Sequence, residues 1–115
     1  MGFDRALADE DYCYVTTTGR VSGRPREIEI WFGLQDSLYM LAGRRERADW
    51  VRNLKQDPAV AVRVADVRLT GRARVVDDPG EEALARRLLF EKYSRRYGGN
   101  LEDWRENALP VAVDF

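Results

Sequence analysis

The residues best suited to chemistry form one cationic segment, 16–26, with the sequence TTTGRVSGRPR. Glycines let the backbone turn its N–H groups toward an anion, a hydroxyl donates a hydrogen bond, and guanidinium groups bind phosphate oxygens bidentately. The pattern predicts an anion site, for a phosphate in particular; a solvated basic hairpin loop is the alternative. The residues predicted to form this site are Arg20, Ser22, Gly23, Arg24, Pro25 and Arg26.

A second cationic cluster, 42–47 (AGRRER), lies where a predicted strand gives way to a predicted helix. A helix N-terminus carries partial positive charge and free N–H groups, so Arg44, Arg45 and Arg47 there predict a second anion site. Both clusters lie at ends of elements that are connected through the same hairpin. We therefore expect them to converge on one phosphate-bearing ligand, although either cluster alone is equally typical of a solvated surface.

Four further side chains are candidates for a ligand site, each with a structural alternative. Trp50 could pack over a flat ring or lie in the core, and Asn53 could touch a ligand or anchor a neighbouring strand. Tyr93 and Tyr97 are four residues apart on one face of a predicted helix. Their hydroxyls could donate to a substrate oxygen, or they could be core aromatics with solvated tips.

Composition narrows the chemistry. The 115 residues include no histidine and one cysteine, which excludes Ser/His and Cys/His nucleophilic machinery and the usual zinc ligands, so no metal site is expected. Reactive chemistry would therefore come with a cofactor. The net charge of −1 lacks the basic excess of a nucleic-acid binder, and an arginine stripe at 68, 72 and 74 is the weakest candidate for one. The absence of a signal-like or membrane-length apolar segment predicts a cytoplasmic protein.

Periodicity predicts a single mainly β (α+β) domain, 1–115, with strands joined by short turns. Alternating apolar residues indicate strands at 12–18, 27–34, 38–42, 59–64, 67–76 and 109–115. Helices are expected at 44–55 and from Asp78 to about Tyr97, with a connection or short helical turn around Trp104. Five to six such strands with two helices favour a small antiparallel barrel.

In this order, the motifs TTTGRxSGxPR, WxxNL, DPxVxV and LPVxV resemble those of the deazaflavin-dependent nitroreductases. That family has a split β-barrel related to the pyridoxamine 5'-phosphate oxidase-like flavin-binding proteins. The resemblance covers about residues 12–115. It implies a reductase that transfers a hydride from reduced coenzyme F-420 to a quinone, nitroaromatic or activated alkene.

The resemblance also implies roles for the candidate residues. Segment 20–26 would hold the cofactor's phosphate and tail, and Ala42, Gly43, Arg44 and Arg45 would line its channel. Trp50 and Asn53 would flank the ring or support the helix beside it. Tyr97 and Tyr93 match positions near the substrate.

Two readings of the same fold stay open: an FMN-binding oxidoreductase, and a non-catalytic flavin- or deazaflavin-binding protein. Only about eleven residues precede the first strand, whereas the better-known reductases have a longer segment there that covers the substrate. The apolar outward positions Trp31 and Tyr39 predict a self-association surface, and the resemblance likewise implies a homodimer.

Overall fold

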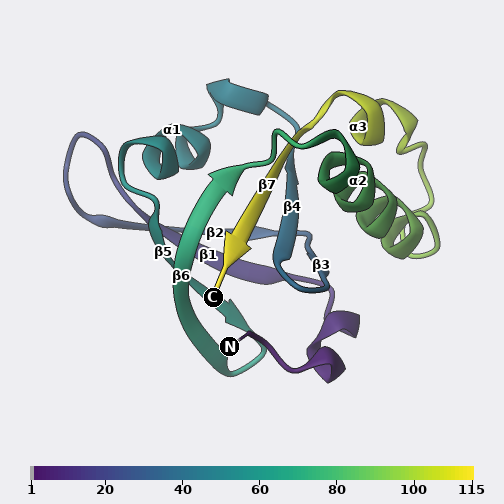
Figure 1. Ribbon diagram of the computed structural model, residues 1–115, viewed down its shortest axis with the longest axis horizontal. Coiled ribbons are helices and arrows are strands. Elements are labelled where there is room, and N and C mark those ends of the chain that lie inside the picture. The colour runs from purple at the N-terminus through teal and green to yellow at the C-terminus, as the bar shows by residue number, and fades with distance from the viewer. Residues whose placement is uncertain (1) are drawn as a thin grey trace.

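The computed structural model describes residues 2–115, and within them one curled antiparallel sheet of seven strands dominates (Figure 1). The strand order is β2-β1-β5-β6-β7-β4-β3. The strands are β1 (Cys13–Thr18), β2 (Pro25–Ile30), β3 (Gly33–Leu34), β4 (Leu38–Ala42), β5 (Ala59–Val64), β6 (Val67–Val75) and β7 (Leu109–Asp114).

The two edge strands explain the curl. β2 and β3 lie at opposite edges of the sheet, yet only Trp31 and Phe32 separate them in sequence. A two-residue connection is too short to cross a flat seven-stranded sheet, so the sheet bends until its edges approach. The result is a half-closed barrel, as the sequence predicts.

Alternation decides which side chains fill the barrel. Along β1 and β5 every second residue is buried, and Val15 and Val62, which pair across these strands, are fully buried. β4 is buried at every position and β7 at all but its last, because α2 covers their outer face. A second apolar cluster under α2 includes Tyr39, Leu89 and Tyr93.

Three α-helices flank the sheet: α1 (Asp49–Gln56), α2 (Pro79–Ser94) and α3 (Glu102–Asn107). The 3-10 turns η1 (Arg5–Asp9) and η2 (Arg45–Arg47) precede β1 and α1. The Asp78 side chain caps α2 by accepting from the Glu81 N–H at 2.8 Å, and Pro79 occupies the first helical position, as predicted. In Figure 1, α1 lies beside the β1–β2 loop, on the opposite side of the molecule from α2 and α3. None of the helices within residues 2–115 is long and apolar enough to cross a membrane.

The predicted elements need three corrections. The single strand 27–34 is interrupted at Trp31–Phe32, which makes seven strands instead of five or six. The predicted helix 44–55 is broken at Ala48, whose φ of −68° and ψ of 135° are extended, so η2 and α1 are separate. The turn around Trp104 is a third helix, α3, and α2 ends at Ser94.

The predicted self-association surface is wrong in its particulars. Tyr39 is buried, and Trp31 is half-buried against Tyr93 and Trp104, so helices α2 and α3 of the same chain cover both residues.

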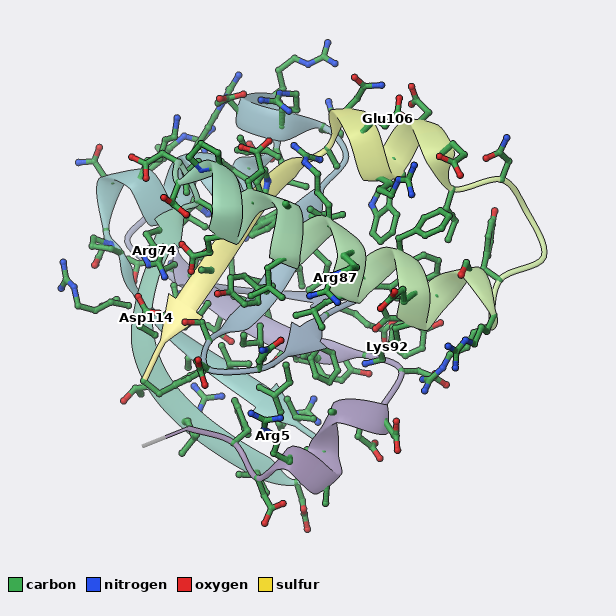
Figure 2. The ribbon with its side chains drawn as sticks, turned by 45° about the vertical axis from the view of Figure 1, so that its right-hand side comes forward. Arg5, Arg74, Arg87, Lys92, Glu106 and Asp114 are labelled. Atoms are coloured by element: carbon green, nitrogen blue, oxygen red, sulfur yellow. The ribbon has the colours of Figure 1, made fainter. Side chains whose placement is uncertain are left out.

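The arginine stripe at 68, 72 and 74 also differs from a bare cationic face. Arg74 pairs with Glu81 of α2 and with Asp114 of β7 at 2.7 Å each, and Figure 2 shows Arg74 beside Asp114.

Candidate functional site

The β1–β2 loop, residues 19–24, is a closed turn whose shape depends on glycine. The Gly19 N–H donates to the Arg24 carbonyl and the Gly23 N–H to the Gly19 carbonyl, each at 2.8 Å. Gly23 has a φ of +72°, which a side chain would strain. A Cβ on Gly19 would lie 2.8 Å from Ser22 Oγ and 3.2 Å from the Arg24 carbonyl oxygen, so the loop would have to shift to admit one.

These bonds change the predicted anion site. The N–H groups of Gly19, Arg20, Gly23 and Arg24 all have acceptors within the protein, so they do not form the expected open cradle. Among residues 2–115, no acceptor is found for the N–H groups of Val21 and Ser22. An anion bound by the loop backbone would therefore have only these two N–H groups at its tip as donors.

Arg20 fastens the loop to α1. Its Nη1 donates to Asn53 Oδ1 at 2.9 Å, its Nη2 contacts Asp49 Oδ1 at 3.1 Å, and its backbone N–H also donates to Asn53 Oδ1 at 3.1 Å. Asn53 Nδ2 in turn donates to Thr17 Oγ1 at 3.1 Å. Asn53 and Thr17 are 4% and 2% exposed, so this arrangement joins the barrel interior to the loop.

Sequence reasoning gave strand anchoring as one of two readings for Asn53, but it assigned Arg20 only to anion binding and did not single out Thr17 or Asp49. The signal was present: Thr17 is a polar residue at an inward position of β1, and Asn53 is polar on the inner face of α1. Two buried polar side chains on packed elements must satisfy each other, because an unpaired one is costly. Of the two readings for Asn53, the structure shows the anchoring contact.

A cavity of about 460 Å³ opens between this loop and the first turn of α1, and we call it the α1 cavity. Its walls include Arg20, Ser22, Arg26, Trp50 and Asn53, all predicted site residues. Arg26 is exposed, and no carboxylate within residues 2–115 pairs with it. Glu27 and Asp49 also line the cavity, so its two arginines face two carboxylates. The volume lies in the range of small-ligand sites.

The other loop residues lie elsewhere. Gly23 and Pro25 line a neighbouring hollow of about 500 Å³ on the outer face of β1, β5 and β6. That hollow is lined largely by small residues such as Ala61 and Gly71. Arg24 is exposed and lines neither cavity.

The second cationic cluster does not reach the α1 cavity, so the predicted convergence is not seen within one chain. Ala42 is buried in the core and pairs with Leu109. Arg45, at a φ of +53°, turns away and donates from Nη1 to the Asn107 carbonyl at 2.6 Å. Gly43 and Arg44 are exposed, and no residue of 42–47 lines the cavity.

The two tyrosines differ from each other and lie apart from the cavity. The Tyr93 hydroxyl is buried: it accepts from the Phe32 N–H at 2.9 Å, and its proton faces the carbonyls of Asp11 at 2.8 Å and Phe32 at 3.1 Å. Burial raises the Tyr93 pKa. This geometry corrects the prediction of a substrate-facing Tyr93, because the hydroxyl is committed to the backbone.

Tyr97 remains available. It is 50% exposed and stands edge-on to Trp31, with ring centroids 5.6 Å apart. Trp31 also stacks on Tyr93 at 4.3 Å. No tyrosine lines the α1 cavity, so a contact between Tyr97 and a ligand in that cavity stays a prediction.

Metal and thiol chemistry find no support in the described residues. Within residues 2–115, no three His, Cys, Asp or Glu side chains gather as a metal site would require. Cys13 is buried in the barrel, where it packs as a small core residue, and burial raises the pKa of its thiol to about 12.

Comparison with known proteins connects this geometry to a family. The model of a family described as F420H(2)-dependent quinone reductase matches residues 3–115. No curated protein matches the chain. Solved structures with the same fold include an F420-H2 dependent reductase (FDR-A), with 23% identity, a TM-score of 0.69, and coverage of 98% of this chain and 96% of that one.

Two other solved structures share the fold. A conserved hypothetical protein from Mycobacterium tuberculosis has 18% identity and a TM-score of 0.72, with coverage of 97% of this chain and 79% of that one. A protein described as a domain-swapped dimer has 24% identity and a TM-score of 0.71, with coverage of 96% and 81%. At these identities the likeness establishes the split-barrel fold.

Proposed function

The chain belongs to the F420H(2)-dependent quinone reductase family, whose cofactor is coenzyme F420, and on that premise we propose that it reduces a small organic acceptor. Quinones are the first class to test, followed by nitroaromatics and activated alkenes. The observation that carries the proposal is the α1 cavity, where the predicted residues Arg20, Ser22, Arg26, Trp50 and Asn53 meet.

The chemistry of the cavity fits a phosphate-bearing, partly aromatic cofactor. Arg26 offers an unpaired guanidinium, the tip of the loop offers the N–H groups of Val21 and Ser22, and Trp50 offers a half-buried ring. We propose that Arg26 and the loop tip hold the anionic part and that Trp50 packs against the ring or supports it. Arg24 and Arg44 are exposed and lie outside this cavity, and we propose them as contacts for the cofactor's anionic tail.

When bound in reduced form, coenzyme F420 supplies the hydride. The chain's own residues then need only bind, orient and shield the reactants. Asn53 and Arg20 keep the loop pressed on α1, so that Arg26 and Ser22 stay in position. Glu27 and Asp49 leave the cavity with no net charge, so we expect affinity to depend on directed hydrogen bonds more than on bulk attraction.

The substrate side needs a contribution from outside the cavity. We propose that Tyr97, half exposed beside Trp31, contacts the acceptor, and that a second copy of the chain completes the pocket in a cytoplasmic homodimer. The domain-swapped dimer among the related structures supports association in this fold. Sedimentation at working concentration tests the dimer, and a monomer would remove it.

Two parallel titrations test the cofactor assignment. Purified protein is titrated with coenzyme F420 and with FMN, and binding is read by fluorescence. We expect selective F420 binding, weakened by about 1–3 kcal/mol in Arg26→Ala, the range for a lost charge-assisted contact. Arg68→Ala, an exposed arginine of β6, is the matched control and should leave affinity unchanged.

The outcomes separate the alternatives. Preference for FMN would place the protein in the flavin-binding branch of the fold. Selective F420 binding without reduction of any quinone or nitroaromatic would identify a non-catalytic carrier. Equal affinities of the wild type and Arg26→Ala would refute the assignment of the α1 cavity.

A further inference from the structure

Lys92, on α2, is a partly buried lysine with no carboxylate partner within residues 2–115. Its Nζ donates to the Phe32 carbonyl at 3.1 Å and lies 3.8 Å from the centre of the Phe32 ring and 5.1 Å from that of Tyr93. Lysines removed from water are usually ion-paired. Figure 2 shows Lys92 between α2 and the N-terminal segment. The amine is thus held by one carbonyl and two rings.

Lys92 lines its own cavity of about 260 Å³ between α2, β3 and η1. Leu34 and Leu88 supply apolar wall, while Arg95 and Arg96 directly follow the C-terminal end of α2. This cavity shares no residue with the α1 cavity, so it is a separate place in the molecule. Nothing in the proposed reductase chemistry uses it.

The environment raises the neutral fraction of the Lys92 amine above that of an exposed lysine. Burial, assisted by the charge of Arg96, lowers the Lys92 pKa to about 8. A neutral lysine amine is a nucleophile toward carbonyl carbon. The titratable and charged groups that face it from the surrounding elements are Asp9, Asp11, Cys13, Glu91, Tyr93, Arg95 and Arg96.

The two arginines are not equivalent. Arg96 Nη1 pairs with Asp11 Oδ1 at 2.5 Å and donates to the Asp9 carbonyl at 2.9 Å. Arg95 is exposed, and no carboxylate within residues 2–115 pairs with it. Its position three residues after Lys92 lets it bind an anion attached to a molecule that reacts at Nζ.

We propose that Lys92 forms an imine with a small aldehyde that carries a carboxylate or phosphate, and that Arg95 binds the anion. The Nζ lone pair attacks the carbonyl carbon and a C–N bond forms. The two amine protons leave with the carbonyl oxygen as water, and the C=N bond results. No oxidant or reductant takes part.

The chain provides its own control, because Lys55 is its only other lysine and is exposed on α1. Wild-type protein is treated at pH 8 with glyoxylate, glycolaldehyde phosphate or neutral acetaldehyde, in the presence of cyanoborohydride. Peptide mass mapping then quantifies the reduced adduct at Lys92, at Lys55 and at the amino terminus. An ordinary lysine with a pKa of about 10.4 is less than about 1% neutral at pH 8, so we expect labelling of Lys92 at least about tenfold faster than of Lys55.

The ratio of labelling at Lys92 to labelling at Lys55 corrects for the differing reactivity of the aldehydes. We expect this ratio to be several-fold higher for an anionic aldehyde than for acetaldehyde, and the better of glyoxylate and glycolaldehyde phosphate identifies the anion. Arg95→Ala should abolish that preference, while Arg87→Ala, at an exposed position of α2, should preserve it. Equal labelling of the two lysines, or an anion preference that is absent or survives in Arg95→Ala, would overturn the proposal. The wild-type comparison needs no variant, so a folding defect cannot obscure it.

Discussion

Replacing Asn53 with alanine tests how the barrel interior controls the loop. Asn53 accepts two hydrogen bonds from Arg20 and donates one to Thr17. Losing a net hydrogen bond costs about 0.5–1.5 kcal/mol, and leaving the buried Thr17 hydroxyl unpaired costs about 1–3 kcal/mol. Because the Arg20 groups regain water, we expect the free energy of unfolding to fall by about 2–4 kcal/mol.

Urea denaturation followed by tryptophan fluorescence measures this loss, and the F420 titration is repeated on the folded variant. A domain of this size has a total stability of about 5–15 kcal/mol, so the variant should still fold. We expect weaker F420 binding, because Ser22 and Arg26 lose the support that positions them.

A double-mutant cycle sharpens the result. Thr17→Val removes the hydroxyl that Asn53 contacts. The double variant should therefore lose much less free energy of unfolding than the sum of the losses in the two single variants. Additive losses, or an Asn53→Ala variant within about 0.5 kcal/mol of wild type, would refute the buried link between barrel and loop.

Three further predictions follow from other contacts. Tyr93→Phe should lower the free energy of unfolding by about 1–3 kcal/mol, because it leaves the buried Phe32 N–H without an acceptor, and it should leave kcat unchanged. Denaturation and steady-state kinetics check this, and a large loss of kcat without a loss of stability would contradict it. Gly19→Ala should weaken F420 binding, because the added Cβ would force the loop to shift, whereas Gly43→Ala adds its Cβ in open space and should not. Similar F420 affinities of the two variants would count against the loop geometry. Arg74 lowers the pKa of Glu81, so the ionised Glu81 stabilises the fold fully above the unfolded carboxyl pKa of about 4.3, and this stabilisation declines as pH falls through the lower folded pKa. Between pH 7 and pH 3, Arg74→Met should therefore lose less free energy of unfolding than the wild type does, as denaturation at each pH would show.

Periodicity was enough to predict most of the sheet, because burial in a barrel alternates with the pleat. It failed at Trp31–Phe32, where the alternation continues although the chain leaves one edge of the sheet and joins the other. That break depends on long-range contacts, including the Phe32 N–H bond to Tyr93, which no local pattern reveals.

The sequence indicated several of the residues that line the candidate cavity, but not the contacts that these residues make with one another. Residue types indicated that Arg20, Arg26 and Trp50 belong near a ligand, and all three line one cavity. Their types could not show that Arg20 is already paired with Asp49, or that Arg45 turns toward Asn107. Such pairings are decided by which elements pack together, and a single sequence shows only which side chains are able to form them.

The position of β7 has a consequence for folding. β7 lies between β6 and β4, and the paired residues Met40 of β4 and Val111 of β7 are 71 positions apart in sequence. Until residues 109–114 have left the ribosome, β4 and β6 each expose an edge that has no neighbour, and exposed edges promote pairing between chains. The barrel core therefore closes late during synthesis, and we expect this protein to fold more slowly than a helical protein of equal length.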